Sequence, residues 1–299
     1  MLDSHLVSPL GQASGMLSPV STDSNDHPLN GTNATEHSVG ADLPRTIATL
    51  DEAETYRALV TATNWATLGH AYGSAAEAPK RLAELLAQDQ SVRTKALDYL
   101  HHALHHQNTL YEATVPAALC VAAILPNPRT IRTVDKNHHL TTVCMRAELL
   151  HWIASVADAV TDEADVLSRR HGFPLDDYPP AVDVRRIRPP LYSAAVAYVD
   201  DTDPQVAEAA ITACIPLLDD PRLLHHRTAL IPAIRQTLGT SERWQHREQA
   251  IDALDTWGED STGLEGQQNP FLFCDSDAPT GSASWSIDTS EGYSEPPPF

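Results

Sequence analysis

Residues 79–107 read PKRLAELLAQDQSVRTKALDYLHHALHHQ and predict two helices joined by a tight turn. Pro79 suits the first turn of a helix, where its missing N–H costs nothing. Asp89 is expected to cap the second helix by accepting hydrogen bonds from its first N–H groups. Apolar residues recur at helical spacing in both halves, and the stripe on the second helix is broad enough to face a core. They are Leu82, Leu85 and Leu86, then Val92, Ala96, Leu97, Leu100, Ala103 and Leu104.

The same pattern returns 114 residues later, from Asp203 onward. The matching residues are Asp203, Val206, Ala210, Ile211, Cys214, Leu217 and Leu218. A weaker third copy follows 40 residues further on, with Arg247, Ala250, Ile251 and Leu254 at the places of Arg93, Ala96, Leu97 and Leu100. A separation of 114 residues is close to three units of about 40 residues, the length of a helical-hairpin repeat.

The chain resembles the HEAT-repeat family, including bacterial HEAT-repeat proteins, over residues 51–258. The resemblance depends on Asp89-Gln-Ser-Val92-Arg93 with Ala96-Leu97, and on Asp203-Pro-Gln-Val206 with Ala210-Ile211. The second copy departs from the pattern because Ala207 replaces the Arg, and the third has Arg243 and His246 at the Asp and Val places. The resemblance implies an all-α, right-handed α-α superhelix of about five helical hairpins, armadillo-like in class. It names no ligand.

The charge of the chain is uneven. The formal net charge is −20, but residues 1–44 carry five acids and no Lys or Arg, and residues 259–299 carry eight acids and no Lys or Arg. The part between them therefore has a net charge of −7. This balance argues against wholesale binding to nucleic acid, which needs a cationic surface.

Composition also sets expectations for the ends of the chain and for its location. Residues 1–45 and 259–299 are polar and aperiodic, so we expect disordered segments around a helical repeat domain at 46–258. The N-terminus has no basic region followed by an apolar core, so it does not resemble a secretory signal. No apolar run approaches the ~20 residues that span a bilayer. We therefore expect a cytoplasmic protein without a membrane partner.

Residues 161–190 contain several prolines and no clear period, and they predict a long loop that interrupts the helical array. The segment holds Arg185, Arg186 and Arg188. Arg pairs well with carboxylate or phosphate, so these side chains could form an anion site. They could equally be solvated charge that balances nearby aspartates, and this second interpretation is favoured because 17 of the 20 bases of the chain are Arg.

Four histidines follow one another at helical spacing: His101, His102, His105 and His106. Two of these pairs lie one turn apart, which is a spacing that can chelate a metal. No Cys or carboxylate supplies a third ligand nearby, so an exposed polar edge of the helix is the favoured interpretation. The sequence predicts no cofactor and no metal site beyond this weak candidate.

No catalytic motif is found: there is no Gly-rich phosphate loop, no GxSxG and no CxxC. We expect a non-enzymatic scaffold that binds another protein, with a basic surface as the complement to this acidic chain. By analogy with bacterial HEAT proteins, it could mask a partner in the manner of an immunity protein or antitoxin. The alternative is a HEAT-type enzyme that acts on nucleic acid or a cofactor. The expected partner-binding residues are Arg93, Lys95, Asp98, His102, Arg185, Arg186 and Arg188.

Overall fold

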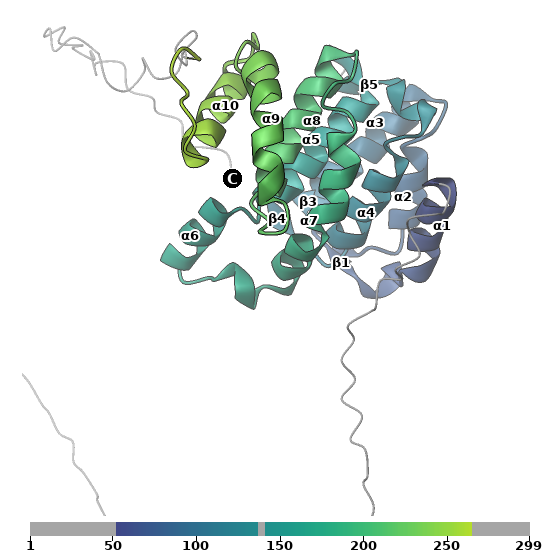
Figure 1. The fold of residues 1–299 in the computed structure, drawn as a ribbon. Coiled ribbons are helices and arrows are strands. Elements are labelled where there is room, and N and C mark those ends of the chain that lie inside the picture. The colour runs from purple at the N-terminus through teal and green to yellow at the C-terminus, as the bar shows by residue number, and fades with distance from the viewer. Residues whose placement is uncertain (1–51, 137–140, 265–299) are drawn as a thin grey trace, which may run out of the picture. The chain divides into compact units, whose positions relative to one another are not determined.

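The computed structural model describes residues 52–136 and 141–264, which belong to one compact unit. The disorder expected for residues 1–45 and for most of the C-terminal segment falls outside these residues. Within them the chain is mostly helical, as expected (Figure 1). Leu264 still packs against the core, so the packed part extends a few residues past Gly258.

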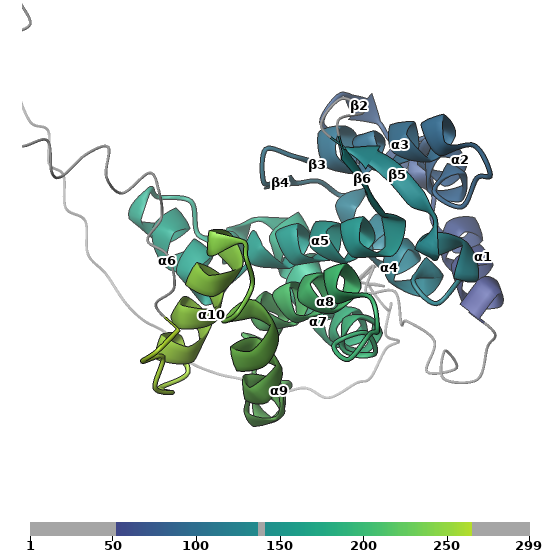
Figure 2. The ribbon, with the colours of Figure 1, turned by 90° about the horizontal axis from the view of Figure 1, so that it is seen from above.

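The helices form two rows of neighbours (Figures 1 and 2). In the first row α1 (Glu52–Ala62) packs on α4 (Thr114–Ile124), which packs on α7 (Pro179–Val196). In the second row α5 (Met145–Asp158) packs along α8 (Pro204–Leu217), and α8 contacts α10 (Trp244–Thr256). The remaining helices are α2 (Ala78–Glu84), α3 (Gln90–Tyr99), α6 (Asp162–Arg170) and α9 (Arg227–Ala233).

The two best copies of the predicted repeat match in the way their second helices begin. Asp89 caps α3 by accepting hydrogen bonds from the N–H groups of Ser91 and Val92, and Asp203 caps α8 by accepting one from Gln205. In the weak third copy Arg243 occupies the N-cap position of α10, but its side chain makes no capping hydrogen bond. The cap predicted at Asp89 is therefore confirmed, and its counterpart Asp203 caps α8 in the same way.

Three short β-hairpins interrupt the helices, and the expectation of a purely α structure missed them. Antiparallel pairs form between β1 (Gly69–His70) and β2 (Gly73–Ser74), between β3 (His105–His106) and β4 (Thr109–Leu110), and between β5 (Thr133–Lys136) and β6 (Thr141–Cys144). In the second hairpin Gln107 and Asn108 both have positive φ, 49° and 59°. This is the backbone of a two-residue type I′ turn, which matches the twist of paired strands.

The expectation of a long loop at residues 161–190 is wrong. The segment instead holds α6, a short 3₁₀ turn (η5, Leu175–Asp177) and most of α7. Pro179 and Pro180 occupy the first turn of α7, where proline is tolerated, but Pro189 and Pro190 lie inside the helix. They cannot donate to the carbonyls of Arg185 and Arg186, four residues earlier. Arg222 Nη2 donates to both of these carbonyls instead, at 3.3 and 3.2 Å.

Arg222 also holds a buried carboxylate. Its Nε and Nη2 donate to Asp220 at 2.8 and 2.6 Å, and Asp220 is only 2% exposed. Burial alone would raise the pKa of Asp220, but the hydrogen bonds from Arg222, with the charges of Arg222 and Arg188, lower it. The proline-bearing helix α7 is thus stabilised by a side chain that follows α8 in the sequence.

Most of the predicted core residues of the two best repeats are buried, although Leu86 and Val92 are only half-buried. Leu97 is 4% exposed and Ile211 is fully buried, and both belong to one continuous apolar core. The equivalent Ile251 in the third copy is only half-buried, in keeping with its weaker pattern.

We predict that Leu97→Ala and Ile211→Ala each lower the free energy of unfolding by about 2–5 kcal/mol, because each leaves a cavity in a packed core. Urea denaturation measures the change, and Lys95→Ala, on the exposed side of α3, is the matched control with a small effect. A loss below about 0.5 kcal/mol at either apolar position would contradict the assignment.

We predict that Arg222→Met lowers the free energy of unfolding by about 1–3 kcal/mol, since it leaves Asp220 and two carbonyls without their donor. In a Pro189→Ala, Pro190→Ala background the helix regains its own N–H donors, so the same change should cost at least about 0.5 kcal/mol less. A double-mutant cycle by urea denaturation measures this coupling. Additive losses would show that Arg222 acts through Asp220 alone.

Candidate functional site

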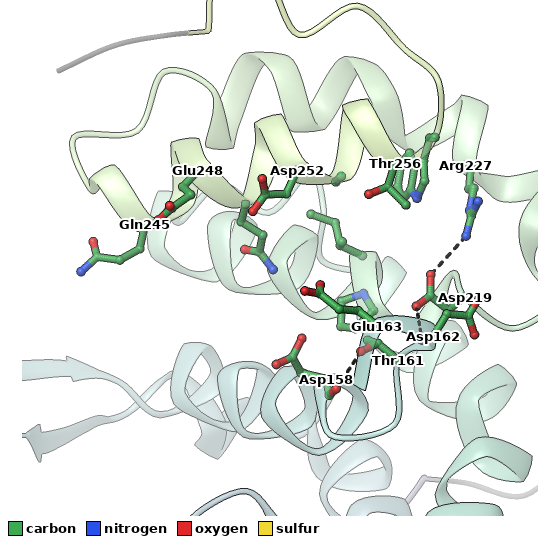
Figure 3. Close-up of a pocket in the computed structure, with 15 residues that line it drawn as sticks. Asp158, Thr161, Asp162, Glu163, Asp219, Arg227, Gln245, Glu248, Asp252 and Thr256 are labelled. Carbon is green, nitrogen blue, oxygen red and sulfur yellow. Dashed lines mark hydrogen bonds and ion pairs between the residues drawn. The ribbon is translucent and has the colours of Figure 1, made fainter. Parts of the chain in front are cut away.

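An acidic cleft of about 570 Å³ lies where the end of α5, the start of α6, the end of α8 and one face of α10 meet (Figure 3). Carboxylates line it from three separate segments of the chain. They are Asp158, Asp162, Glu163, Asp219, Glu248 and Asp252. The sequence analysis missed this cleft because no local motif joins the three segments, and only the packing of α10 against α8 brings the last of them near.

The carboxylates of the cleft repel one another. The pKa of Asp158 is raised by burial and by the charges of Glu163 and Asp219. The pKa of Asp252 is raised by burial and then by Glu163 and Asp255. Glu163 therefore contributes to the repulsion on both sides of the cleft. A cation placed between these groups would relieve this repulsion.

Among the residues that the structure describes, one basic side chain lines the cleft, and it is already engaged. Arg227 pairs with Asp219 at 3.1 Å, and its guanidinium lies 5.3 Å from the centre of the Trp257 ring. Asp219 also accepts a hydrogen bond from the N–H of Asp162, yet burial still raises its pKa. The negative charge of the cleft is thus only partly neutralised by the described residues.

Arg93 was expected on a binding surface, and that expectation is wrong. Arg93 is 4% exposed. Its Nη1 donates to the carbonyls of Ala87 and Gln88 at 2.9 and 2.7 Å, and its Nε donates to Thr133 at 3.2 Å. Burial lowers the pKa of Arg93, which has no carboxylate partner among these contacts. Arg93 therefore joins the end of α2 to the hairpin strand β5 rather than facing a partner.

Arg188 is buried as well, which corrects its assignment to a partner surface. It is 3% exposed, and its Nη2 donates to the carbonyl of Val160. The neighbouring arginines reach solvent but are paired: Arg185 with Asp176 at 2.9 Å, and Arg186 with Asp183 at 2.6 Å. These pairs agree with the interpretation of the group as balanced charge. They line a mixed-charge cleft of about 550 Å³ that shares Asp162 and Asp219 with the acidic cleft.

Lys95, Asp98 and His102 are exposed, as expected, and lie on α3 and the π-helical turn η3 (Leu100–Leu104) that continues it. The arginines at 185–188 lie on α7, which packs on α4 and α8. None of these residues lines the acidic cleft.

The four histidines do not share one helix, which corrects the spacing argument for a metal site. The helix ends at Leu104, and His105 and His106 form strand β3. His105 is 4% exposed, with its Nδ1 3.2 Å from Ser155 Oγ, while the ring of His106 packs 5.7 Å from that of Tyr72. Within the ranges 52–136 and 141–264, no group of three or more His, Cys, Asp or Glu residues could hold a metal ion.

One cluster brings together the residue types of nucleophilic catalysis. Ser241 Oγ donates to Glu208 at 2.9 Å and lies 3.3 Å from His246 Nδ1, which is 3.4 Å from Glu208. Ser241 also accepts a hydrogen bond from the N–H of Arg243 at the start of α10. Ser241 and His246 are buried, and the cluster lines neither of the clefts described above. These contacts connect the start of α10 to α8.

Comparison with models of protein families finds no match, and comparisons with curated proteins and with solved structures find no similar protein. Among the helices that the structure describes, none is long and apolar enough to cross a membrane.

We predict that acid weakens the fold through His105. Burial, and then the charge of His101, lower the pKa of His105 to about 4, below the ordinary value of 6.5. Only the unfolded chain binds this proton between these two values, so stability rises with pH there and is lost as pH falls. The loss is about 3 kcal/mol over the full interval.

Urea denaturation between pH 7 and pH 5 measures the effect. His105→Gln should flatten this pH dependence, whereas His102→Gln, at an exposed position, should leave it as in the parent chain. Equal pH dependence in the parent chain and His105→Gln would contradict the role of His105.

Proposed function

We propose that this protein is a non-enzymatic interaction module that binds a basic segment of another protein in the acidic cleft between α5, α6, α8 and α10. The observation that carries the proposal is the set of six carboxylates around one cleft with a single, already paired arginine. A lysine or arginine side chain entering the cleft would find acceptors on both walls: Asp158 and Glu163 on one, Glu248 and Asp252 on the other (Figure 3).

The electrostatics support a cationic ligand. Asp158, Asp219 and Asp252 have raised pKa values, which means that the protein stabilises their charged form less well than water does. A guanidinium or ammonium group would supply the missing counter-charge. Arginine would gain most, since its planar group can bind carboxylates through two hydrogen bonds.

The repeated helical hairpins favour a protein as the ligand. The Asp-capped helices α3 and α8, at matching places in their repeats, agree with the HEAT-like pattern read from the sequence. In such proteins a stack of helical hairpins presents an extended surface to a macromolecule. The proposal extends to a cytoplasmic protein that masks a basic surface of its partner, in the manner of an immunity protein or antitoxin. The charge of the cleft speaks against the nucleic-acid-binding alternative, because phosphates would be repelled.

We predict that a synthetic peptide rich in arginine binds the full chain, and that Glu248→Gln with Asp252→Asn weakens binding about five- to tenfold. Each lost pair at such a partly exposed site is worth about 0.2–1 kcal/mol. Calorimetric titration measures the affinity, which should also fall as salt is raised. An acidic peptide of the same length should not bind.

The matched control is Asp98→Asn with Glu242→Gln, which removes the same charge from exposed positions outside the cleft. It should bind the peptide as the parent chain does. If the control weakens binding as much as the cleft variant, the peptide responds only to the net charge of the chain and the cleft is not the site.

A further inference from the structure

Helix α6 is packed with its polar side inward. Its residues Ala164, Asp165 and Ser168 are half-buried, and it packs mainly against η5. Asp165 accepts a hydrogen bond from the N–H of Leu175 and pairs with Arg185 of α7 at 3.7 Å, and Ser168 Oγ donates to the carbonyl of Phe173. No residue of α6 is buried. Both views of the fold show this helix standing apart from the rows of helices (Figures 1 and 2).

The apolar residues of α6 are exposed, and Leu167 also borders a cleft of about 610 Å³ that Asp158, Glu163 and Leu175 line with it. Val166 is 51% exposed and Leu167 is 54% exposed, and Phe173, just after the helix, is 75% exposed. Glu163 precedes this apolar pair by one turn and Arg170 follows it by one turn, so the four residues form one stripe along the helix. Glu163 and Arg170 are both exposed, and no ion pair joins either of them to another described residue.

The stripe is complementary to itself. A two-fold axis midway between Val166 and Leu167 places Glu163 opposite Arg170 of a second copy, and Arg170 opposite its Glu163. The apolar pairs then meet at the centre. This is the relation that a symmetric dimer requires, because the same patch must fit itself. The antiparallel arrangement also sets the acidic start of each helix, Asp162 and Glu163, beside the basic end of the other, Arg169 and Arg170.

We propose that α6 is the contact surface of a weak homodimer, in which two copies of the helix pair antiparallel through Glu163, Val166, Leu167 and Arg170. The ends of the chain itself are poorly suited to cover this stripe, because residues 1–44 and 259–299 contain no Lys or Arg that could pair with Glu163. A purely basic ligand would leave Arg170 without a partner. A second copy satisfies both ends of the stripe.

The small size of the surface determines the strength of the dimer. A helix of nine residues is about 14 Å long, and its exposed stripe with Phe173 buries less than the ~1,000 Å² typical of a stable interface. The dimer therefore forms only at high protein concentration. The net charge of −20 opposes it over long distances, but at about 0.15 M salt such repulsion is screened beyond about 8 Å.

Sedimentation velocity of the full chain between about 10 µM and about 1 mM tests the dimer. The parent chain should sediment faster as its concentration rises. Glu163→Arg and Arg170→Glu should each weaken association at least about tenfold, because each sets two like charges opposite one another across the symmetric contact. Leu167→Ser should weaken it as well, through lost apolar contact.

An equimolar mixture of the Glu163→Arg and Arg170→Glu chains gives the decisive result. In the mixed pair every charge again faces its opposite, so association should return to the parent level. The controls Asp98→Arg and Arg57→Glu make the same charge changes at exposed positions of α3 and α1 and should associate as the parent chain does. Circular dichroism and the melting temperature verify that each variant is folded.

Three results would overturn the proposal: a parent chain that stays monomeric at all concentrations, single variants that associate like the parent, or a mixture that does not recover association. Glu163 belongs to both surfaces, but the peptide test changes only Glu248 and Asp252, which lie outside the stripe, and it is run at low protein concentration, where the chain is monomeric. The dimer and the proposed function can therefore fail separately.

Discussion

The fold depends on arginine side chains that donate to backbone carbonyls where helices end. A helix leaves its last four carbonyls without partners, and a chain of short helices has many such ends. Arg93 donates to the turn after α2, Arg146 to Leu125 at the end of α4 (3.1 Å), and Arg227 to Leu218 at the end of α8 (3.2 Å). Arg188 and Arg247 do the same for the carbonyls of Val160 and Ser241. Because the guanidinium is planar with five donors, it can serve several carbonyls at once.

This use of arginine explains why the chain contains far more arginine than lysine. It also means that some of the arginines are not available to bind a partner. The chain has 17 arginines and only three lysines. A lysine is a compact charge on a flexible stem and cannot replace a fork that holds two carbonyls at fixed positions. The arginines that the sequence offered as a binding surface are in part the connectors of the helices. With Arg93 and Arg188 engaged inside the fold, the surface that lacks its counter-charge is the acidic cleft.

Local signals in the sequence were sufficient for the core and the helix starts, but contacts between distant residues were not predictable. Asp89 and Leu97 could be assigned because a cap and an apolar stripe each depend on neighbours within a turn or two. Helix α7 could not be assigned in this way, because the carbonyls that its internal prolines leave without N–H donors bind Arg222, more than thirty residues away. The hairpin at Gln107 and Asn108 lacks the glycine that usually marks a type I′ turn. The cleft needs three segments that only the fold brings together.

Helix α6 contributes to both the acidic cleft and the exposed stripe. Apolar burial holds the other helices, whereas α6 is held by hydrogen bonds and ion pairs from Asp165 and Ser168. Water competes well for such contacts at the surface, so they contribute little stability compared with a buried apolar face. Glu163, on this weakly held helix, lines the acidic cleft and also begins the exposed stripe. A cation in the cleft and a second copy on α6 would therefore draw on the same carboxylate, that of Glu163.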